Sequence, residues 1–600
     1  MVNININGKD IVAKENMTIL EAAKANDIHI PTLCYLEGVS AFGGCRICVV
    51  EVEGARNLQA ACKVKIRDGM KIKTNSKRAL DTRRMNYQLL ISDHDINCLS
   101  CVRNNSCELQ ALGRELGIKE SEFESVSKED VIDISESLTR NPNKCILCRR
   151  CVATCEKIQK TSVIKPINRG FKTKIGPYFD KHLGDVDCAF CGQCSVVCPV
   201  GAISETSHEQ RVLDALEDKD KYTIVQVAPA VRVAIAEEFG DYSGKSVTGK
   251  LANALSKIGF DNVFDTNWSA DLTIMEEGTE FLSRVTDLFA GKKAVLPMLT
   301  SCSPGWVKFI ENHYSNQLEH LSTCKSPHTM FGAVLKSYYA EKIGVPAENI
   351  FVISVMPCTA KKTEIARKEM QNDGNKNVDA VITTRELANI IKTMGIDFMN
   401  LEDREFDQPL GFSSGAADIF GLTGGVMEAA LRTVYELVTG RELPFPDLHV
   451  KDIVGFDQIK TATIEFKDVK EEFKFLEGFK LNIAVTSGLD GADKLMKEID
   501  EGKSPYHFIE VMGCPGGCIM GGGQPRTSDF EKTKNRRLKS LYGEDERKKV
   551  RKSHENPAII EFYNEWGAPG GHKSHEYLHT TYVQRGRFNE NGNESFTLEK

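Results

Sequence analysis

The sequence predicts a multidomain protein that combines α+β domains, in its N-terminal third, with a large two-lobed α/β domain. Six hundred residues exceed what one hydrophobic core usually holds, roughly 250–300 residues. Fifteen of the 20 cysteines precede residue 200, which separates a cysteine-rich part from the rest. After residue 210, strand candidates alternate with helical segments, as in parallel sheets covered by helices. The predicted segments are 1–80, 81–125, 126–209, 210–582 and a disordered tail, 583–600.

Composition excludes several classes of protein. Hydrophobic residues make up 41% and charged residues 27%, as in an ordinary globular chain. A net charge of −7 argues against nucleic acid as a partner. The first residues lack the apolar core of a signal peptide, and no run of about 18 apolar residues occurs. We therefore expect a cytoplasmic protein without a membrane span, whose clustered cysteines bind soft metals rather than form disulfides.

Segment 1–80 combines a hairpin signal with four cysteines. The Asn7-Gly8 pair lies between alternating apolar and polar residues, and residues 17–27 have helical spacing. The ligand candidates are Cys34, Cys45, Cys48 and Cys62. This pattern resembles the β-grasp fold of plant-type ferredoxins, with a longer first spacing, and implies one [2Fe–2S] cluster.

Segment 81–125 contains one histidine and three cysteines. They are His94, Cys98, Cys101 and Cys107. A neutral imidazole can complete the ligand set of a [4Fe–4S] cluster, but a zinc site would have the same spacing. The spacing alone does not separate the two. Because the segment lies between two redox segments and zinc carries no electrons, we favour a [4Fe–4S] cluster.

Segment 126–209 contains two copies of C-x2-C-x2-C-x3-C, a repeat typical of bacterial ferredoxins. In this repeat the fourth cysteine binds the cluster of the other copy. The predicted ligand sets are Cys145, Cys148, Cys151 and Cys198, and Cys188, Cys191, Cys194 and Cys155. Together with the preceding segment this predicts three accessory [4Fe–4S] clusters. Four clusters in series would form an electron relay.

Segment 210–582 contains strand candidates at YTIVQV, KAVLPMLTS, NIFVISVMP and KLNIAVTSG, and the first passes into a helical pattern. Ligands of such folds bind beyond the carboxyl ends of the strands. Cys302 and Cys358 stand at two of these ends. We therefore expect the active site there.

Three motifs in this segment are TSCSPGW (300–306), MPCTAKKTE (356–364) and EVMGCPGGCIMGGGQP (510–525). In this order, after the cluster-binding segments, the chain resembles the iron-iron ([FeFe]) hydrogenases, and in particular their larger clostridial-type members. The resemblance extends to about residue 582. It implies an oxidoreductase of anaerobic hydrogen metabolism that catalyses 2H⁺ + 2e⁻ ⇌ H2. It also implies an H-cluster, a [4Fe–4S] cube joined to a diiron unit with CO, cyanide and azadithiolate.

Matching motif positions imply the roles of individual residues. Cys358 and Cys514 would bind the cube, and Cys518 would bridge it to the diiron unit. Lys361 would bind a cyanide. The remaining pocket residues would be Met356, Met512, Pro229, Ala230 and Pro327. Glycines 516–517 and 521–523 would let the backbone pass close to the cofactor.

The resemblance also implies a proton route of Cys302, Glu277, Ser322, Glu280 and Arg284. Glu277 and Glu280 are spaced i,i+3, so a helix would place both on one face. Without the resemblance, we would interpret these residues as a solvated helix edge.

One position departs from the family. The usual first motif has two adjacent cysteines, of which the first transfers protons and the second binds the cube; here Cys302 is followed by Ser303. Either Cys302 binds the cube and another group moves the proton, or Ser303 is an oxygen ligand. We favour the first alternative. Cys324 is expected to be a packing residue.

The expected partners are protons, H2, ferredoxin or a similar electron carrier, and the maturation proteins that install the diiron unit. An alternative is the catalytic subunit of an NAD(P)-linked or electron-bifurcating complex, whose partner subunits would bind the nucleotide, because the chain lacks a G-x-G-x-x-G fingerprint. A hydrogen sensor and an iron–sulfur assembly factor are further alternatives, disfavoured by the glutamates of the route and the complete second and third motifs.

Overall fold

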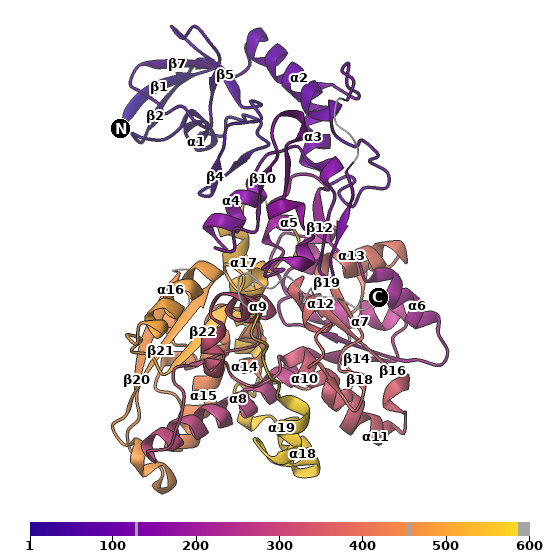
Figure 1. The fold of residues 1–600 in the computed structure, drawn as a ribbon, viewed down its shortest axis with the longest axis vertical. Coiled ribbons are helices and arrows are strands. Elements are labelled where there is room, and N and C mark those ends of the chain that lie inside the picture. Colours follow the sequence, from indigo (N-terminus) through magenta and orange to yellow (C-terminus); the bar gives the residue numbers. More distant parts are fainter. Residues whose placement is uncertain (126–129, 454–457, 528, 586–600) are drawn as a thin grey trace. The chain divides into compact units, whose positions relative to one another are not determined.

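The computed structural model of the protein describes residues 1–125, 130–453, 458–527 and 529–585 (Figure 1). The chain forms two compact units. The first comprises Met1–Lys157, Ser162–Val186 and Gln193–Ser204, and the second comprises Ile158–Thr161, Asp187–Gly192 and Glu205–Lys600. Most of the predicted disordered tail, 583–600, lies outside the described residues. Within the described ranges, every helix is too short or too polar to cross a lipid bilayer.

The first unit begins with a five-stranded sheet in the order β2-β1-β7-β5-β6. Asn7 and Gly8 form the predicted hairpin turn, and both have the positive φ that a type I′ turn requires. The predicted helix at 17–27 is shorter, because Thr18 caps it together with Glu21 in a capping box. The elements are β1 (Val2–Ile6), β2 (Lys9–Ala13), α1 (Ile19–Lys24), β5 (Val49–Val52), β6 (Gln59–Ala60) and β7 (Met70–Lys73).

The rest of the first unit consists of short elements joined by cysteine-containing loops. The longest is α2 (Lys77–Ser92). Two small sheets follow, one in the order β12-β9-β8 and one of β10 and β11. The other elements are β3 (Tyr35–Leu36), β4 (Ser40–Ala41), α3 (Glu108–Leu116), β8 (Asp133–Ile134), β9 (Leu138–Arg140), α4 (Arg150–Lys157), β10 (Ile164–Ile167), β11 (Lys174–Pro177), α5 (Gln193–Val197) and β12 (Ile203–Glu205).

The second unit contains two four-stranded sheets, as expected for an α/β domain with two lobes. One is parallel throughout, in the order β14-β13-β16-β19. The other has the order β15-β22-β21-β20, and only β20 is antiparallel to its neighbour. The strands are β13 (Tyr222–Val227), β14 (Asn262–Asp265), β15 (Met298–Leu299), β16 (Ile350–Met356), β19 (Ala380–Thr383), β20 (Ile459–Glu465), β21 (Lys480–Ser487) and β22 (Phe508–Met512), with a small hairpin of β17 (Gln371–Asn372) and β18 (Asn375–Lys376).

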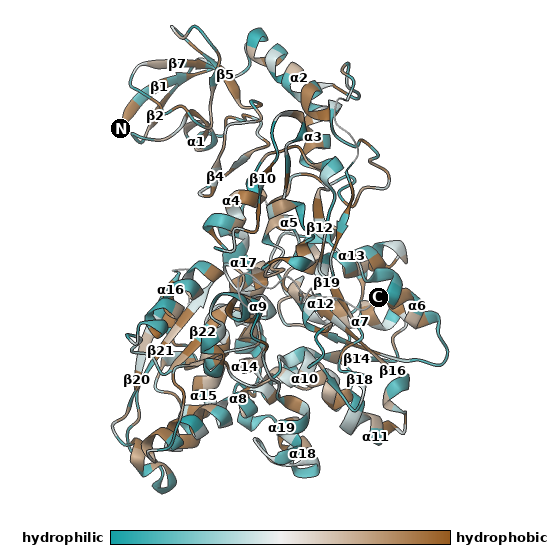
Figure 2. Ribbon diagram, viewed as in Figure 1, coloured by the Kyte–Doolittle hydropathy of each residue, from teal (hydrophilic) through white to brown (hydrophobic). Residues whose placement is uncertain are grey.

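Helices cover these sheets, and each sheet has its own apolar core. Figure 2 shows helices such as α16 with one polar and one apolar side, as expected for elements packed on a sheet. The helices are α6 (Glu209–Glu217), α7 (Thr248–Ile258), α8 (Thr266–Phe289), α9 (Pro304–His313), α10 (Pro327–Val334), α11 (Ala340–Ile343), α12 (Ala360–Glu364), α13 (Thr384–Thr393), α14 (Gly415–Asp418), α15 (Gly425–Thr439), α16 (Leu489–Asp500), α17 (Phe530–Arg547), α18 (Pro557–Trp566) and α19 (His572–Leu578).

Two further elements differ from the sequence-based prediction. The expected strand KAVLPMLTS is reduced to Met298–Leu299. Its Pro297 has no amide hydrogen to donate, so the ladder begins after it. The helix expected after β13 is a turn followed by the 3-10 helix Ile235–Phe239, which ends at left-handed Gly240.

Candidate active site

Loops at the carboxyl ends of three parallel strands hold the motif cysteines of the second unit. Cys302 follows β15, Cys358 follows β16 and Cys514 follows β22, while Cys518 begins a 3-10 turn. Burial raises the pKa of Cys518, and so do the charges of the other three cysteines. The structure therefore brings the four motif cysteines together, at the edge of the sheets where the fold class predicts a ligand.

The donor set fits an iron–sulfur group. Burial raises the pKa of Cys302 to about 12 and also raises the pKa of Cys358. These thiols are therefore neutral at pH 7 unless a cation binds them. Buried thiols that face one another are the ligands that iron–sulfur clusters use, and the metal supplies the charge that stabilises their thiolates.

Lys361 is anchored at this pocket by two contacts. Its Nζ donates to the backbone oxygen of Cys302 at 3.0 Å and forms an ion pair of 2.7 Å with Glu364. Glu364 also accepts from His328 Nε2 at 2.9 Å, in a fully buried group. The ammonium is thus held beside the motif cysteines, and its contact with a cyanide stays a prediction.

The other predicted pocket residues occupy strand ends and loops. Met356 ends β16 and Met512 ends β22, and both are buried. Met512 packs in an apolar cluster with Cys302 and Cys518. Ala230 packs with Cys518 in a second cluster. Pro229 is buried in the loop after β13, and Pro327 begins α10.

The glycines of the third motif pack against other backbone segments. A Cβ on Gly521 would lie 2.2 Å from the oxygen of Pro357, and one on Gly522 would lie 2.4 Å from the oxygen of Cys191. Gly517 has a φ of +81°, and a Cβ there would meet the amide nitrogen of Thr423 at 2.8 Å. These contacts between chain segments require glycine in the loop that holds Cys514 and Cys518.

Cys302 and Ser303 have different neighbours. The Ser303 hydroxyl accepts a hydrogen bond of 3.1 Å from the amide of Gly513, the residue before Cys514. Cys302 instead interacts with Glu277, whose ionised form would add to burial in raising the pKa of the Cys302 thiol. The serine therefore contacts the residue before a motif cysteine, and the Cys302 thiol is within electrostatic range of Glu277, the first predicted carboxylate of the proton route.

The predicted proton-route residues form a connected group. Ser322 is fully buried and donates to Glu280 Oε2 at 3.0 Å, and it also hydrogen-bonds Glu277. Arg284 donates to Glu280 Oε1 at 2.6 Å. Burial, followed by the charge of Glu280, raises the pKa of Glu277 to about 8. Glu277 is 2% exposed, which rules out the interpretation of this helix face as a solvated edge.

In the first unit, the four cysteines of segment 1–80 face one another. Cys34 hydrogen-bonds Cys45, and Cys48 hydrogen-bonds Cys62. The Cys45 thiol and the backbone amides of residues 43–45 lower the pKa of Cys34 to about 5. Amides directed at a sulfur stabilise its thiolate, as expected for cluster ligands.

His94 has the properties of a metal ligand. Its Nδ1 atom is buried and has no hydrogen-bond partner among the described residues. Burial lowers the pKa of His94 to about 4, so its imidazole is neutral. Burial raises the pKa of Tyr87, and the charges of Cys107 and Cys98 raise it further. Both of these predicted cysteines are therefore within electrostatic range of one tyrosine.

The four cysteines of one predicted ligand set lie within electrostatic range of one another, as the crossed arrangement requires. Burial raises the pKa values of Cys145, Cys148 and Cys151, and each also senses the charge of Cys198. In the other predicted set, Cys155 and Cys194 belong to the first unit, whereas Cys188 and Cys191 belong to the second. That second set stays a prediction.

Sequence reasoning missed one buried carboxylate, Glu510. It accepts from the amides of Gly424 and Met427, each at 2.7 Å, and burial raises its pKa to about 7. Its position two residues before Met512 in the third motif was an available signal. It also missed a group of Glu280, Cys324 and His579, for which no local signal exists because the histidine is far away in sequence.

Comparisons with known proteins agree with this arrangement. Residues 221–522 match the family described as iron only hydrogenase large subunit, C-terminal domain, and residues 531–585 match iron hydrogenase small subunit. Residues 1–77 match a 2Fe-2S iron-sulfur cluster binding domain. Residues 83–122 match the NADH-ubiquinone oxidoreductase-G iron-sulfur binding region, and residues 135–204 match the ferredoxin-like domain of NADH-quinone oxidoreductase subunit 3.

Relatives match nearly the whole chain. The NADP-reducing hydrogenase subunit HndD of Solidesulfovibrio fructosivorans is 49% identical over 98% of this chain and 100% of the relative. Iron hydrogenase 1 of Clostridium pasteurianum is 42% identical over 97% of this chain and 100% of the relative. The solved structure of a variant of [FeFe]-hydrogenase HydA1 from Chlamydomonas reinhardtii is 43% identical, with a TM-score of 0.57, and covers 64% of this chain and 100% of that chain. The chain therefore belongs to the iron-only, or [FeFe], hydrogenases, which are oxidoreductases acting on H2, and it carries iron–sulfur domains in front of the catalytic domain.

Proposed function

We propose that this chain catalyses the reversible reaction 2H⁺ + 2e⁻ ⇌ H2 with protons supplied through Glu280, Ser322 and Glu277. The observation that carries the proposal is the Ser322 hydroxyl, which hydrogen-bonds both Glu280 and Glu277, together with Glu277 lying near enough to Cys302 to add to burial in raising the pKa of its thiol. The accessory clusters, one [2Fe–2S] and three [4Fe–4S] by the ligand patterns, would carry the electrons. When bound, the H-cluster supplies the iron centre at which protons and electrons combine.

The residues of the chain hold and move the protons. Glu277 has a pKa of about 8, so at pH 7 its carboxyl carries a proton that it can pass on. The Ser322 hydroxyl can accept a proton from Glu280 and donate its own to Glu277. Arg284 holds Glu280 in place at the outer end of the route. Lys361, anchored by Glu364, keeps a positive charge beside the motif cysteines.

The contacts of Cys302 and Ser303 support the second of the two sequence-based alternatives. Besides burial, the charge of ionised Glu277 raises the pKa of Cys302, as expected for a thiol at the end of a proton route. The Ser303 hydroxyl accepts a hydrogen bond from the amide of Gly513, which precedes the proposed cube ligand Cys514. We therefore assign proton transfer to Cys302 and the fourth ligand position of the cube to Ser303, with Cys358, Cys514 and Cys518 in the other three positions.

Two variants of the anaerobically matured protein test this assignment. Cys302→Ser should keep its iron content and the infrared bands of CO and cyanide, and should lose about 10²–10⁴-fold in H2 evolution from reduced viologen. Ser303→Cys should keep the bands and the turnover and shift the reduction potential of the cube. Loss of iron from the Cys302→Ser protein would mean that Cys302 binds the cube. Full cofactor loading of the wild-type protein without H2 would contradict the enzymatic function itself.

The electron partner is either a ferredoxin or an NAD(P)-linked set of subunits. The 49% identical relative is named an NADP-reducing hydrogenase subunit, which favours the second possibility. The chain lacks a dinucleotide-binding fingerprint, so nucleotide chemistry would belong to partner subunits. Coupled to H2, the purified chain should reduce ferredoxin but not NADP⁺. Reduction of NADP⁺ only when the chain is copurified with its neighbouring subunits would establish the complex.

A further inference from the structure

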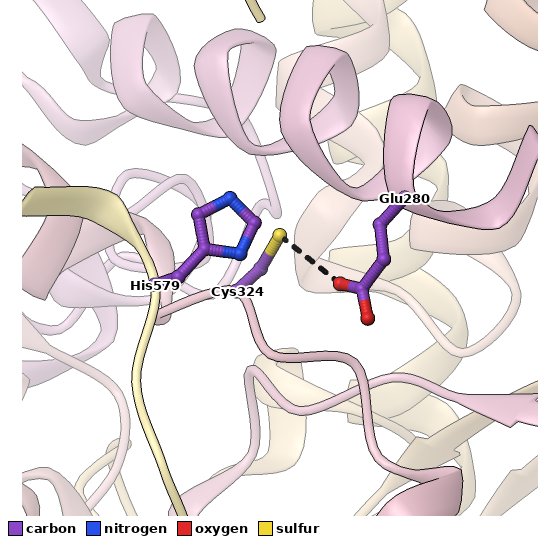
Figure 3. A group of neighbouring side chains, drawn as sticks. All are labelled: Glu280, Cys324 and His579. Atoms are coloured by element: carbon purple, nitrogen blue, oxygen red, sulfur yellow. Dashed lines mark hydrogen bonds between the residues drawn. The ribbon is translucent and has the colours of Figure 1, made fainter. Parts of the chain in front are cut away.

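Three potential metal ligands meet at the outer part of the proton route. Figure 3 shows Glu280, Cys324 and His579 pointing toward one another, and one ligand atom from each lies within 4.8 Å of the other two. Cys324 Sγ donates to Glu280 Oε2 at 3.8 Å. Cys324 is 1% and His579 is 9% exposed. Neither Cys324 nor His579 has a role in the function proposed above.

The backbone holds two of these residues side by side. Cys324 and His579 form an antiparallel bridge. On either side of it, the Thr580 amide donates to the Thr323 oxygen at 2.7 Å and the Lys325 amide donates to the Leu578 oxygen at 2.8 Å. The relative positions of the thiol and the imidazole are therefore set by paired backbone rather than by two mobile side chains. A metal site needs this kind of preorganisation.

The histidine is also oriented as a metal ligand. Its Nε2 forms a hydrogen bond of 3.2 Å with Glu276. Glu276 is fully buried and is held in turn by the Tyr563 hydroxyl at 2.6 Å and the Gly570 amide at 2.9 Å. A carboxylate on one ring nitrogen is the usual support of a histidine that binds a metal through the other. Here the other nitrogen, Nδ1, lies 2.7 Å from the Thr323 hydroxyl, which itself donates to Glu280.

One sulfur, one imidazole nitrogen and one carboxylate oxygen form a ligand set of intermediate softness, which suits zinc(II). Binding would release the thiol proton of Cys324 to solvent and form a zinc–sulfur bond, while the neutral imidazole and the Glu280 carboxylate complete three positions. Water would occupy the fourth. The charges of the thiolate, Glu280 and Glu276 offset those of the ion and Arg284. Exposed His575 packs against His579 with its ring tilted by 42° and 4.4 Å between ring centroids, and it lies on the side open to solvent.

We propose that Glu280, Cys324 and His579 form a binding site for zinc(II) or a similar divalent cation, and that the bound ion stops proton transfer by occupying the Glu280 carboxylate. The blocking effect rests on the proposed function of Glu280 in the proton route. The site itself does not, since it depends only on the three ligands and on Glu276.

Zinc K-edge absorption of the holoenzyme with one equivalent of Zn²⁺ tests the site without any assay of turnover. The wild-type protein should show one zinc–sulfur distance of about 2.3 Å together with nitrogen or oxygen ligands. Cys324→Ser should remove the sulfur shell and weaken Zn²⁺ binding at least about tenfold. The matched control is His554→Asn, which disrupts the other group of neighbouring ligands, Glu436, His554 and Glu555. The control should leave the sulfur shell unchanged, and the iron content must stay constant throughout.

A sulfur shell that persists in Cys324→Ser, or that is absent from the wild-type protein, would overturn the site. H2 evolution then tests the blocking effect. Saturating Zn²⁺ should lower the wild-type rate at least about tenfold below its zinc-free rate, while Cys324→Ser should evolve H2 at the same rate with Zn²⁺ as in its own zinc-free sample. A zinc–sulfur shell without inhibition would refute the blocking effect. A protein without any H2 evolution would refute the proposed function, and the absorption result would still decide whether the site exists.

Discussion

The two compact units differ in what holds their backbone together. In the second unit, β16 has 7 residues, β21 has 8 and α8 has 24, and large side chains such as Trp268 and Phe331 stack in the core. In the first unit, β8 to β12 have only two to four residues each. Several apolar side chains near them stay exposed, including Phe179 at 90% and Val131 at 82%.

This difference indicates which part of the protein depends on its cofactors for folding. Strands this short do not form a stable sheet unaided, so we expect cluster ligation to crosslink the loops around β8 to β12, whereas the five-stranded sheet of the first unit has its own apolar core. The apolar cores of the second unit order its sheets without a metal. Its pocket can therefore form first and receive a cofactor later. Four changes test this contrast, beginning with the largest expected effect.

Removal of iron should disorder the region of β8 to β12 in the first unit and spare the second unit. After chelation under reducing conditions, amides of β8 to β12 should exchange hydrogen nearly as fast as in an unfolded chain, because their crosslinks are lost. Amides of β13 and β16 should stay protected. Hydrogen exchange followed by mass spectrometry measures both in one sample. Equal loss of protection in the two units would abolish the contrast.

Glu277→Gln should act on catalysis and leave both folds unchanged. Glutamine matches the shape of the protonated carboxyl but cannot release the proton, so H2 evolution should fall about 10²–10⁴-fold. In the wild-type protein, Glu277 is protonated below its pKa of about 8, and H2 evolution should decline as the pH rises through that value. The variant should lose this part of the pH profile. The same profile in the variant would assign the titration to another group.

Arg432→Met tests the buried charges of the second unit. Arg432 is fully buried and pairs with Glu428 at 2.7 Å and Asp545 at 2.9 Å. Its loss leaves two buried carboxylates with fewer partners and should lower the opening free energy of the α15 amides by about 3–5 kcal/mol. Arg441→Met is the control, because its pair with Asp468 is 52% and 80% exposed, and it should cost less than about 1 kcal/mol. An equal loss of stability in Arg432→Met and Arg441→Met would show that burial of the ion pair does not determine how much its removal destabilises the fold.

Thr18→Ala should have the smallest effect. It removes the capping box of α1, and should lower the stability of the N-terminal sheet by about 1 kcal/mol. Denaturation monitored by the visible absorption of the [2Fe–2S] cluster would measure this. The cluster of Cys34, Cys45, Cys48 and Cys62 should still form. Loss of the cluster would mean that the local helix, rather than the ligands, orders this region.

The sequence alone determined the features that depend on local spacing. The hairpin at Asn7-Gly8, the candidate ligands and the α/β alternation after residue 210 all follow from short patterns, since turns, ligand loops and strand periodicity involve neighbours in the chain. The position of Cys302 and Cys358 at strand ends was predictable for the same reason. The resemblance to the hydrogenases also singled out Glu277 and Glu280, whose i,i+3 spacing predicts one helix face.

Only the tertiary structure decided what distant segments do to one another. The spacing of Cys302 and Ser303 left two alternatives, and their neighbours Glu277 and Gly513 are the basis on which we propose the second. The glycines of the third motif lie against other backbone segments, so their role is not limited to making room for a cofactor. His579 meets Cys324 through backbone pairing of residues 255 positions apart. Such contacts depend on how the sheets and helices pack, and burial then sets the pKa of each group, which no local pattern specifies.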